Sequence, residues 1–187
     1  PVAGRERWAL DADVVTNSFP PGIIDRLGFG SEDLSKTNPR RIYCGVSGFG
    51  REGPQKNAPS YDGKIQALSG VMSITGHEGD GPLRAGFAVC DALTGMTAAF
   101  AVSSAIFQRT HTGKGQLVDV AMFDSTLSFL SPTVVDYTGA RHQQRQFGNQ
   151  ASSRKPTANL FKVKNGYLLL AGNNEGQYRK LARNRKR

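Results

Sequence analysis

Short apolar segments alternate with segments of helical spacing as far as residue 132, and this alternation constrains the fold more than any other feature. Strands are predicted over β-branched or aromatic runs, at residues 13–16, 41–47 and 116–121. Helices are predicted over 23–27, 61–72, 91–109 and 122–130, and Ser31 is expected to cap a further short helix that Asn38-Pro39 ends. Alternating strands and helices predict an α/β fold, a Rossmann-like parallel sheet with flanking helices and right-handed crossovers.

The character of the sequence changes after Pro132. Residues 141–155 are polar and irregular, as a linker is, and residues 166–171 form a lone apolar strand. We therefore expect residues 1–132 to form part of a large α/β domain, and residues 133–187 to form a linker and the start of a smaller domain.

The net charge of +9 is concentrated at the C-terminus. Six of the last nine residues are basic, and without them the net charge of the chain is +3. These six are Arg179, Lys180, Arg183, Arg185, Lys186 and Arg187. We interpret this tail as solvated or disordered, and expect no specific nucleic-acid partner. The mildly basic remainder suits a ligand that carries phosphates.

The cysteines and histidines form no evident metal-binding or disulfide pattern. Cys44 and Cys90 each lie in an apolar stretch, which predicts reduced core residues and a cytoplasmic protein. His77, His111 and His142 are expected in polar loops without ligand-like spacing, so no metal is expected. No run of about 18 apolar residues occurs and the first residues lack the apolar core of a signal peptide, so no membrane partner is expected.

Asp91 is the acid whose position is most informative. It follows the apolar run 87–90 and precedes the longest predicted helix, whose apolar face contains Leu93, Met96, Phe100 and Phe107. One interpretation is an N-cap, for which Asp is favoured. The other is a nucleophile, because a helix N-terminus keeps a carboxylate ionised and open α/β sheets bind ligands at strand-to-helix junctions. The two roles are compatible.

Six short segments between Asp11 and Tyr178 form an ordered series: FPPGIIDRLG (19–28), NPRRIY (38–43), SGFG (47–50) with Gly53-Pro54, YDGKIQALSG (61–70), DALTG (91–95) and TGKGQLVDV (112–120). In this order they resemble the signatures of the class III CoA-transferases, the family of formyl-CoA transferase, carnitine CoA-transferase and α-methylacyl-CoA racemase. Each alone is a weak match, but six in order are highly specific.

The resemblance implies that Asp91 is the catalytic carboxylate, which takes the acyl group from coenzyme A. It implies substrate or CoA contacts from seven further residues: Phe19, Arg26, Gly48, Phe49, Gly50, Tyr61 and Asp62. The implied partners are an acyl-CoA and a carboxylic acid, with a CoA thioester as substrate, no permanently bound cofactor, and an interlocked homodimer for the full-length protein. Ser18 departs from the family's Asn-Phe turn, which implies a weaker hydrogen bond to the coenzyme.

Tyr61 favours CoA transfer over the alternative, 2-methylacyl-CoA racemisation. The resemblance implies that the racemase branch has a histidine at the place of Tyr61, where it moves the α-proton. The phenol of a tyrosine, with a reference pKa of about 10, is a poor base at neutral pH. A second alternative is an inactive CoA-transferase fragment. The chain lacks an initiator Met and the family's N-terminal and C-terminal portions, so the sheet is expected to be incomplete.

Overall fold

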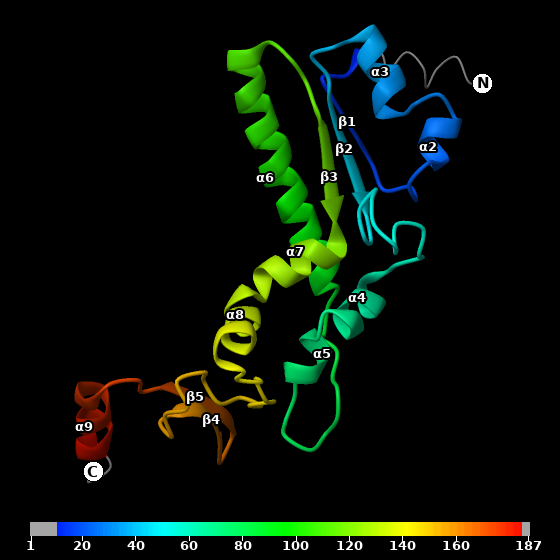
Figure 1. The fold of residues 1–187 in the computed structure, drawn as a ribbon. Coiled ribbons are helices and arrows are strands. Elements are labelled where there is room, and N and C mark those ends of the chain that lie inside the picture. Colours follow the sequence, from blue (N-terminus) through cyan, green and yellow to red (C-terminus); the bar gives the residue numbers. More distant parts are fainter. Residues whose placement is uncertain (1–10, 185–187) are drawn as a thin grey trace.

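A computed structural model describes residues 11–184 and shows the expected parallel α/β fold (Figure 1). Three strands, β1 (Val14–Asn17), β2 (Ile42–Ser47) and β3 (Leu117–Ala121), form a sheet in the order β1-β2-β3. Both pairings are parallel, with Val14 opposite Ile42 and Tyr43 opposite Leu117. All three strands therefore end at the same edge of the sheet.

Helices join these strands and lie on both faces of the sheet (Figure 1). α2 (Ile23–Arg26) and α3 (Ser31–Thr37) connect β1 to β2, and α4 (Asp62–Leu68), α5 (Val71–Ile74) and α6 (Val89–Thr112) connect β2 to β3. α6 runs along one face and contacts β2, β3, α4 and α7. It begins at the carboxyl ends of the strands and runs antiparallel to them.

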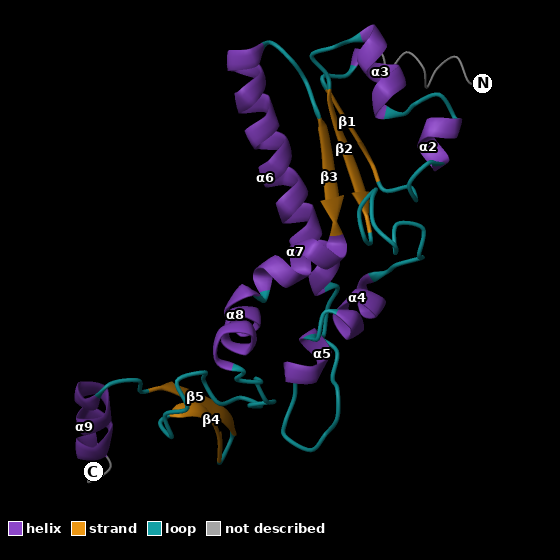
Figure 2. Cartoon of the chain, viewed as in Figure 1, coloured by secondary structure: helices purple, strands orange, loops and turns teal. Residues whose placement is uncertain are grey.

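The chain continues away from the sheet after β3, and the molecule is elongated (Figure 2). α7 (Met122–Phe129) and α8 (Ser131–Ala140) lead into the irregular segment 141–157. A separate antiparallel hairpin follows, made of β4 (Ala158–Val163) and β5 (Gly166–Ala171), and then α9 (Glu175–Asn184). α8 spans the boundary that the sequence places after residue 132.

Two tight contacts hold the amino end of the sheet together. The buried Arg41 side chain donates hydrogen bonds to the carbonyl oxygens of Ala12 and Leu34, at 3.1 and 2.7 Å. Gly115 donates its N–H to Pro39 O at 2.8 Å, and a Cβ at Gly115 would overlap the backbone of Arg41. Glycine is therefore required where the chain enters β3.

The main core lies between the sheet and α6. Ile42 and Cys44 on β2, Ile65 on α4, and Cys90 and Ala105 on α6 are almost inaccessible to solvent. Both cysteines are free. The small residues of α6 let its inner face pack closely on β2 and β3.

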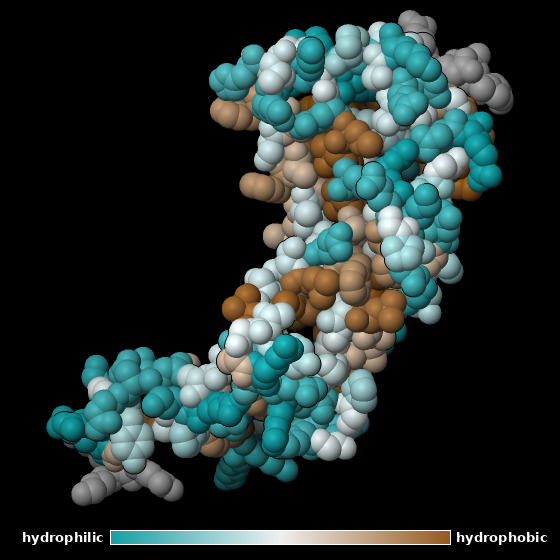
Figure 3. All heavy atoms as spheres, viewed as in Figure 1, coloured by the Kyte–Doolittle hydropathy of each residue, from teal (hydrophilic) through white to brown (hydrophobic). Residues whose placement is uncertain are grey.

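The outer face of α6 is not covered. The expected apolar stripe lies there, with Met96, Phe100 and Phe107 exposed by 71%, 76% and 69%. Within residues 11–184 this helix therefore packs on one side only. Figure 3 shows apolar surface beside α6 and around α7.

α6 also corrects the expectation that no segment could span a membrane. By length and composition alone it could cross one. Yet its inner face contacts the sheet, and Arg109 near its end pairs with Asp13 at 2.9 Å and donates to Arg40 O at 3.2 Å. These contacts are those of a helix that covers a sheet.

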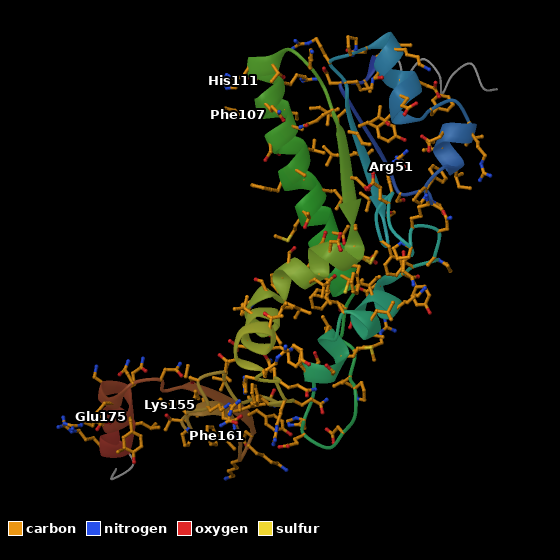
Figure 4. The ribbon with its side chains drawn as sticks, viewed as in Figure 1. Arg51, Phe107, His111, Lys155, Phe161 and Glu175 are labelled. Atoms are coloured by element: carbon orange, nitrogen blue, oxygen red, sulfur yellow. The ribbon has the colours of Figure 1, made fainter. Side chains whose placement is uncertain are left out.

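Several helix boundaries differ from prediction. α3 has Gly30, not Ser31, at its N-cap position. The helix expected over 61–72 is two helices, α4 and α5, separated at Gly70, whose φ of 88° breaks the helical geometry. His111 lies in the last turn of α6 rather than in a loop, with its ring edge-on to Phe107 at 4.9 Å between centroids (Figure 4).

The C-terminal part contains more regular structure than expected. The strand expected alone at 166–171 pairs with β4, and Arg179, Lys180 and Arg183 lie on α9 rather than in a disordered tail. Arg185, Lys186 and Arg187, and the first residues assessed for a signal peptide, lie outside the described residues. The irregular segment expected at 141–155 is confirmed in residues 141–157.

Candidate active site

The candidate site lies at the edge where the parallel strands end and α6 begins. Open α/β sheets bind ligands at the carboxyl ends of their strands. Each strand continues at this edge into a different segment. Phe19 lies in the loop after β1, residues 48–50 form the loop after β2, and Ala121 at the end of β3 leads directly into α7. The amino end of α6 adds the partial positive charge of a 24-residue helix.

Asp91 is the third residue of α6, and its side chain is exposed. This corrects two expectations. The helix begins at Val89, with Ala88 at the N-cap position, so Asp91 is not the cap. The apolar run 87–90 is the end of a loop and the first turn of α6, so Asp91 does not stand at a strand-to-helix junction. Within residues 11–184 no protein group is hydrogen-bonded or ion-paired to the Asp91 carboxylate. Its oxygens are available to a ligand.

Asp62, at the start of α4, is the opposite case. Its side chain is 7% exposed. Its Oδ1 accepts a hydrogen bond from the Cys90 N–H at 2.8 Å, and its Oδ2 accepts one from Gln66 Nε2 at 2.6 Å. Arg84 Nη2 lies 3.6 Å from the same Oδ2. Asp62 thus holds the backbone of the residue that precedes Asp91.

The loop after β2 is fixed by glycine and aromatic contacts. Gly50 has a φ of 81°, and a Cβ at Gly48 would overlap the side chain of Ser60. Gly48 O accepts the Phe123 N–H at 3.0 Å. The Phe49 ring lies 5.9 Å from the Phe123 ring, centroid to centroid, with Lys64 Nζ 5.5 Å above it. These contacts join β2, α4 and α7 at one edge.

A cavity of about 350 Å³ lies beside this loop, between α6, α7 and the end of β3. Phe49 and Gly50 line it, together with Thr97, Asp119 and Ser125. Asp119 Oδ2 accepts the backbone N–H of Arg51 at 2.8 Å. Asp91 lies outside its lining, so the described residues form part of a ligand site rather than an enclosed one.

The structure does not bring Phe19 and Arg26 directly to Asp91. Both are exposed near the end of β1, and the Phe19 N–H donates to Asn17 Oδ1 at 3.2 Å. An ion pair between Asp25 and Arg51, at 3.2 Å, links this part to the loop after β2 (Figure 4). Tyr61, 68% exposed, stands at the N-cap position of α4 beside Asp62.

Sequence reasoning missed Gln66, which is fully buried and connects Asp62 to the loop before α6. Its spacing of four from Asp62 on one helix was the available signal. The Asp25–Arg51 pair was also missed, since the two residues lie 26 positions apart. Within residues 11–184 no cluster of His, Cys, Asp or Glu side chains is arranged to hold a metal.

A parallel α/β sheet with an unpaired carboxylate at its ligand-binding edge defines an enzyme-type α/β domain. Comparison with known proteins makes this specific. The chain belongs to CoA-transferase family III, whose profile matches residues 6–186. This confirms the family resemblance.

The curated relatives are CoA-transferases. The chain is 42% identical over 140 residues to an acetyl-CoA:oxalate CoA-transferase of Acetobacter aceti, a match that covers 74% of this chain and 36% of that protein. It is 36% identical over 168 residues to a succinyl-CoA:glutarate CoA-transferase of Mus musculus, covering 89% and 38% respectively. The chain thus spans well under half the length of these relatives.

Solved structures agree with the fold. A CAIB/BAIF family protein from Brucella suis matches with a TM-score of 0.89 and 35% identity, over 98% of this chain and 49% of that one. The Rv3272 protein of Mycobacterium tuberculosis matches with a TM-score of 0.80 and 25% identity, over 97% and 46%. The chain thus corresponds to about half the length of each of these structures.

Proposed function

We propose that the protein transfers coenzyme A from an acyl-CoA to a carboxylic acid through a covalent intermediate on Asp91. The observation that carries the proposal is the contrast between two neighbouring carboxylates. The oxygens of Asp62 are held by protein donors, whereas those of Asp91 face solvent at the positive end of α6. A nucleophile needs a free lone pair, and of these two carboxylates Asp91 is the one whose oxygens no described protein group occupies.

The proposed reaction exchanges acyl and thiol groups on Asp91. An Asp91 oxygen attacks the thioester carbonyl carbon, the C–S bond breaks, and CoA leaves as a thiolate, giving a mixed anhydride. The thiolate then attacks the aspartyl carbonyl carbon, which releases the donor acid as a carboxylate and leaves an aspartyl-CoA thioester. The acceptor carboxylate repeats these steps in reverse and leaves with CoA, and Asp91 is regenerated.

We propose substrate and CoA contacts from the residues that surround this edge. The Gly50 N–H donates to Ser47 Oγ at 3.0 Å, so the backbone N–H groups of Gly48 and Phe49 are those that would stabilise the oxyanions that form on the attacked carbonyls. Phe19 and Arg26, both exposed, would hold part of the CoA molecule. The exposed Tyr61 hydroxyl would hydrogen-bond the acyl group, which supports transfer rather than racemisation.

The acids exchanged belong to the class that the relatives' names state. The two relatives named above act on oxalate and glutarate, both dicarboxylates. We propose a small carboxylic acid as acceptor. We also propose a cytoplasmic location, an interlocked homodimer for the full-length protein, and a large CoA-binding domain that ends near residue 132.

Replacing Asp91 by Asn tests the nucleophile. Asp91→Asn in the full-length protein should abolish CoA transfer, because the amide cannot form the anhydride. Stability should change by about 1 kcal/mol or less, since Asn is nearly isosteric. The matched control is Asp33→Asn, another first-turn acid, which lies on α3 and pairs with Lys36. Turnover of Asp91→Asn within about tenfold of the unmodified protein would contradict the assignment.

A further inference from the structure

We infer that Asp62 and Gln66 are a buried positioning pair that fixes the start of α6, and with it the reactive carboxylate of Asp91. The inference rests on the proposed function for Asp91 but concerns different residues. It assigns to Asp62 a role other than the substrate contact that the family resemblance implies. Neither residue would touch the substrate.

The pair is placed to act on the loop and the first turn that carry Asp91. Gln66 Oε1 accepts the Ala85 N–H at 2.9 Å, and Gln66 Nε2 lies 3.4 Å from Phe87 O. Asp62 Oδ1 accepts the Cys90 N–H at 2.8 Å. One helix therefore holds the backbone at three points between residues 85 and 90. A first-turn N–H of a helix has no partner inside the helix, so the Asp62 carboxylate supplies the one that Cys90 needs.

The donors and acceptors in this series of hydrogen bonds, from Cys90 through Asp62 and Gln66 to Ala85, cannot exchange roles. A backbone N–H stands at each end, Cys90 against Asp62 and Ala85 against Gln66. Both ends of the pair must therefore present oxygen. The middle contact, 2.6 Å from Gln66 Nε2 to Asp62 Oδ2, must then join one donor to one acceptor. A carboxylate at one position and an amide at the other satisfy these conditions.

Burial makes the pair costly to break. Gln66 is fully buried and Asp62 nearly so. No buried side-chain nitrogen or oxygen of the described residues lacks a hydrogen-bond partner. If a substitution placed one hydrogen-bond donor against another here, neither would find a water molecule to accept its hydrogen bond, because the site is buried. The loop and the first turn of α6 would move to relieve it, and Asp91 would move with them.

Exchanging the two functional groups provides the test. Asp62→Asn alone sets the new amide nitrogen against Gln66 Nε2. Adding Gln66→Glu restores the pattern: the amide nitrogen of residue 62 donates to a carboxylate oxygen of residue 66, and the remaining oxygens accept the Cys90 and Ala85 N–H groups. The double variant has the same net charge as the unmodified pair and nearly the same shape. Two interactions are not restored: the long contact to Phe87 O, and the ion pair between Arg84 and Asp62 Oδ2, whose place the amide nitrogen takes. Arg84→Gln is the matched control, because it removes the partly exposed ion pair to Asp62 and leaves the hydrogen bonds intact.

Amide hydrogen exchange at Cys90 and Ala85 reports the position of the backbone directly. In Asp62→Asn we expect exchange at these amides to quicken by about tenfold or more, and kcat to fall by a similar factor while KM for acyl-CoA stays within about threefold. The double variant should return both quantities to within about threefold of the unmodified protein. Arg84→Gln should change neither by more than about threefold.

The outcomes separate this inference from the proposed function. If Asp91→Asn stays active, the proposed function fails, yet exchange at Cys90 still tests the pair. If Asp62→Asn leaves both exchange and kcat unchanged, the positioning role is wrong. A loss that Gln66→Glu does not restore also contradicts it, because a merely destabilising change would not be rescued by a second buried substitution. Should the single variant fail to fold, recovery of folding in the double variant is the deciding result.

Discussion

Asp62, at the start of α4, and Asp91, in the first turn of α6, both lie near the amino end of α6 and differ in what holds their oxygens. The Asp62 carboxylate is surrounded by Cys90, Gln66 and Arg84, while the Asp91 carboxylate has no partner within residues 11–184. The family resemblance pointed to both acids as site residues, but the sequence could not divide their roles, because that division depends on a contact between residues 28 positions apart. Two residues of the same type therefore differ in what they can do, because one carboxylate is held by hydrogen-bond and ion-pair partners and the other has none within residues 11–184.

The two cysteines should behave as protected core thiols. Burial raises the pKa of Cys90 above its ordinary value of 9.0, and the charges of Asp62 and Asp91 raise it further against an opposing hydrogen bond to Thr126. Burial also raises the pKa of Cys44, with a smaller contribution from Asp119. Each raised pKa stabilises the folded chain fully below the unfolded value of 9.0, and this stabilisation is lost as pH rises through the folded value.

A thiol reagent measures this protection. At pH 7.5 labelling of Cys44 and Cys90 in the folded chain should be at least about tenfold slower than in denaturant, because each thiol must be exposed before it reacts. Thermal stability should fall above about pH 9, where the unfolded thiols ionise first. Equal labelling rates in the folded and denatured chain would show that the thiols are not buried.

At the scale of the element, α6 and the entry to β3 depend on close approach of backbone. Gly115 donates to Pro39 O and lies against the Arg41 backbone. Position 115 requires glycine for steric reasons. The sequence shows only a Gly-Lys-Gly turn here, and indicates neither the hydrogen bond to Pro39 nor the close approach to the Arg41 backbone.

Gly115→Ala should destabilise the fold by about 1 to 3 kcal/mol, because the added methyl overlaps backbone that cannot move aside. The control is Gly139→Ala on α8, where a Cβ meets nothing within 4 Å. That change should stabilise by about 0.5 to 1 kcal/mol, through helix propensity. Denaturant unfolding of both variants checks the pair. A Gly115→Ala variant as stable as the unmodified chain would mean that the β2–β3 contact is looser than described.

The elements that sequence patterns predicted are those with strong local signals. The three strands of the parallel sheet were all predicted, because each is a compact apolar run. β4 was missed: it begins buried at Ala158 but ends exposed, and its pairing with β5 gives little apolar periodicity. α6 begins two residues before its predicted start, since the Asp62 carboxylate supplies the hydrogen bond that a local cap would otherwise make.

At the scale of the whole molecule, apolar side chains lie exposed on more than one element. Besides the outer face of α6, Tyr167 and Leu169 on β5 are 70% and 69% exposed. Neither the outer face of α6 nor these two side chains of the hairpin are covered by another part of the described chain. Surface of this kind marks a site of association.

We predict that the isolated 187 residues do not form a stable, active monomer. Leaving three side chains of α6 uncovered, Met96, Phe100 and Phe107, forgoes on the order of 4 to 9 kcal/mol at about 1.5 to 3 each. That is comparable to the whole stability of a typical domain. Size-exclusion chromatography should show association, and a hydrophobic dye should bind. A clean monomer with a sharp two-state melt and acyl-CoA turnover would contradict this.

The most direct test of the central claim is to trap the activated carboxyl group of Asp91 with hydroxylamine. The full-length protein is incubated with an acyl-CoA and hydroxylamine, and its intact mass and peptide masses are then measured. The covalent route predicts a hydroxamate on Asp91, because hydroxylamine attacks the activated aspartyl carbonyl. The modification should be absent without acyl-CoA and absent in Asp91→Asn. An active protein that never acquires this mass, or that acquires it on another residue, would contradict the account.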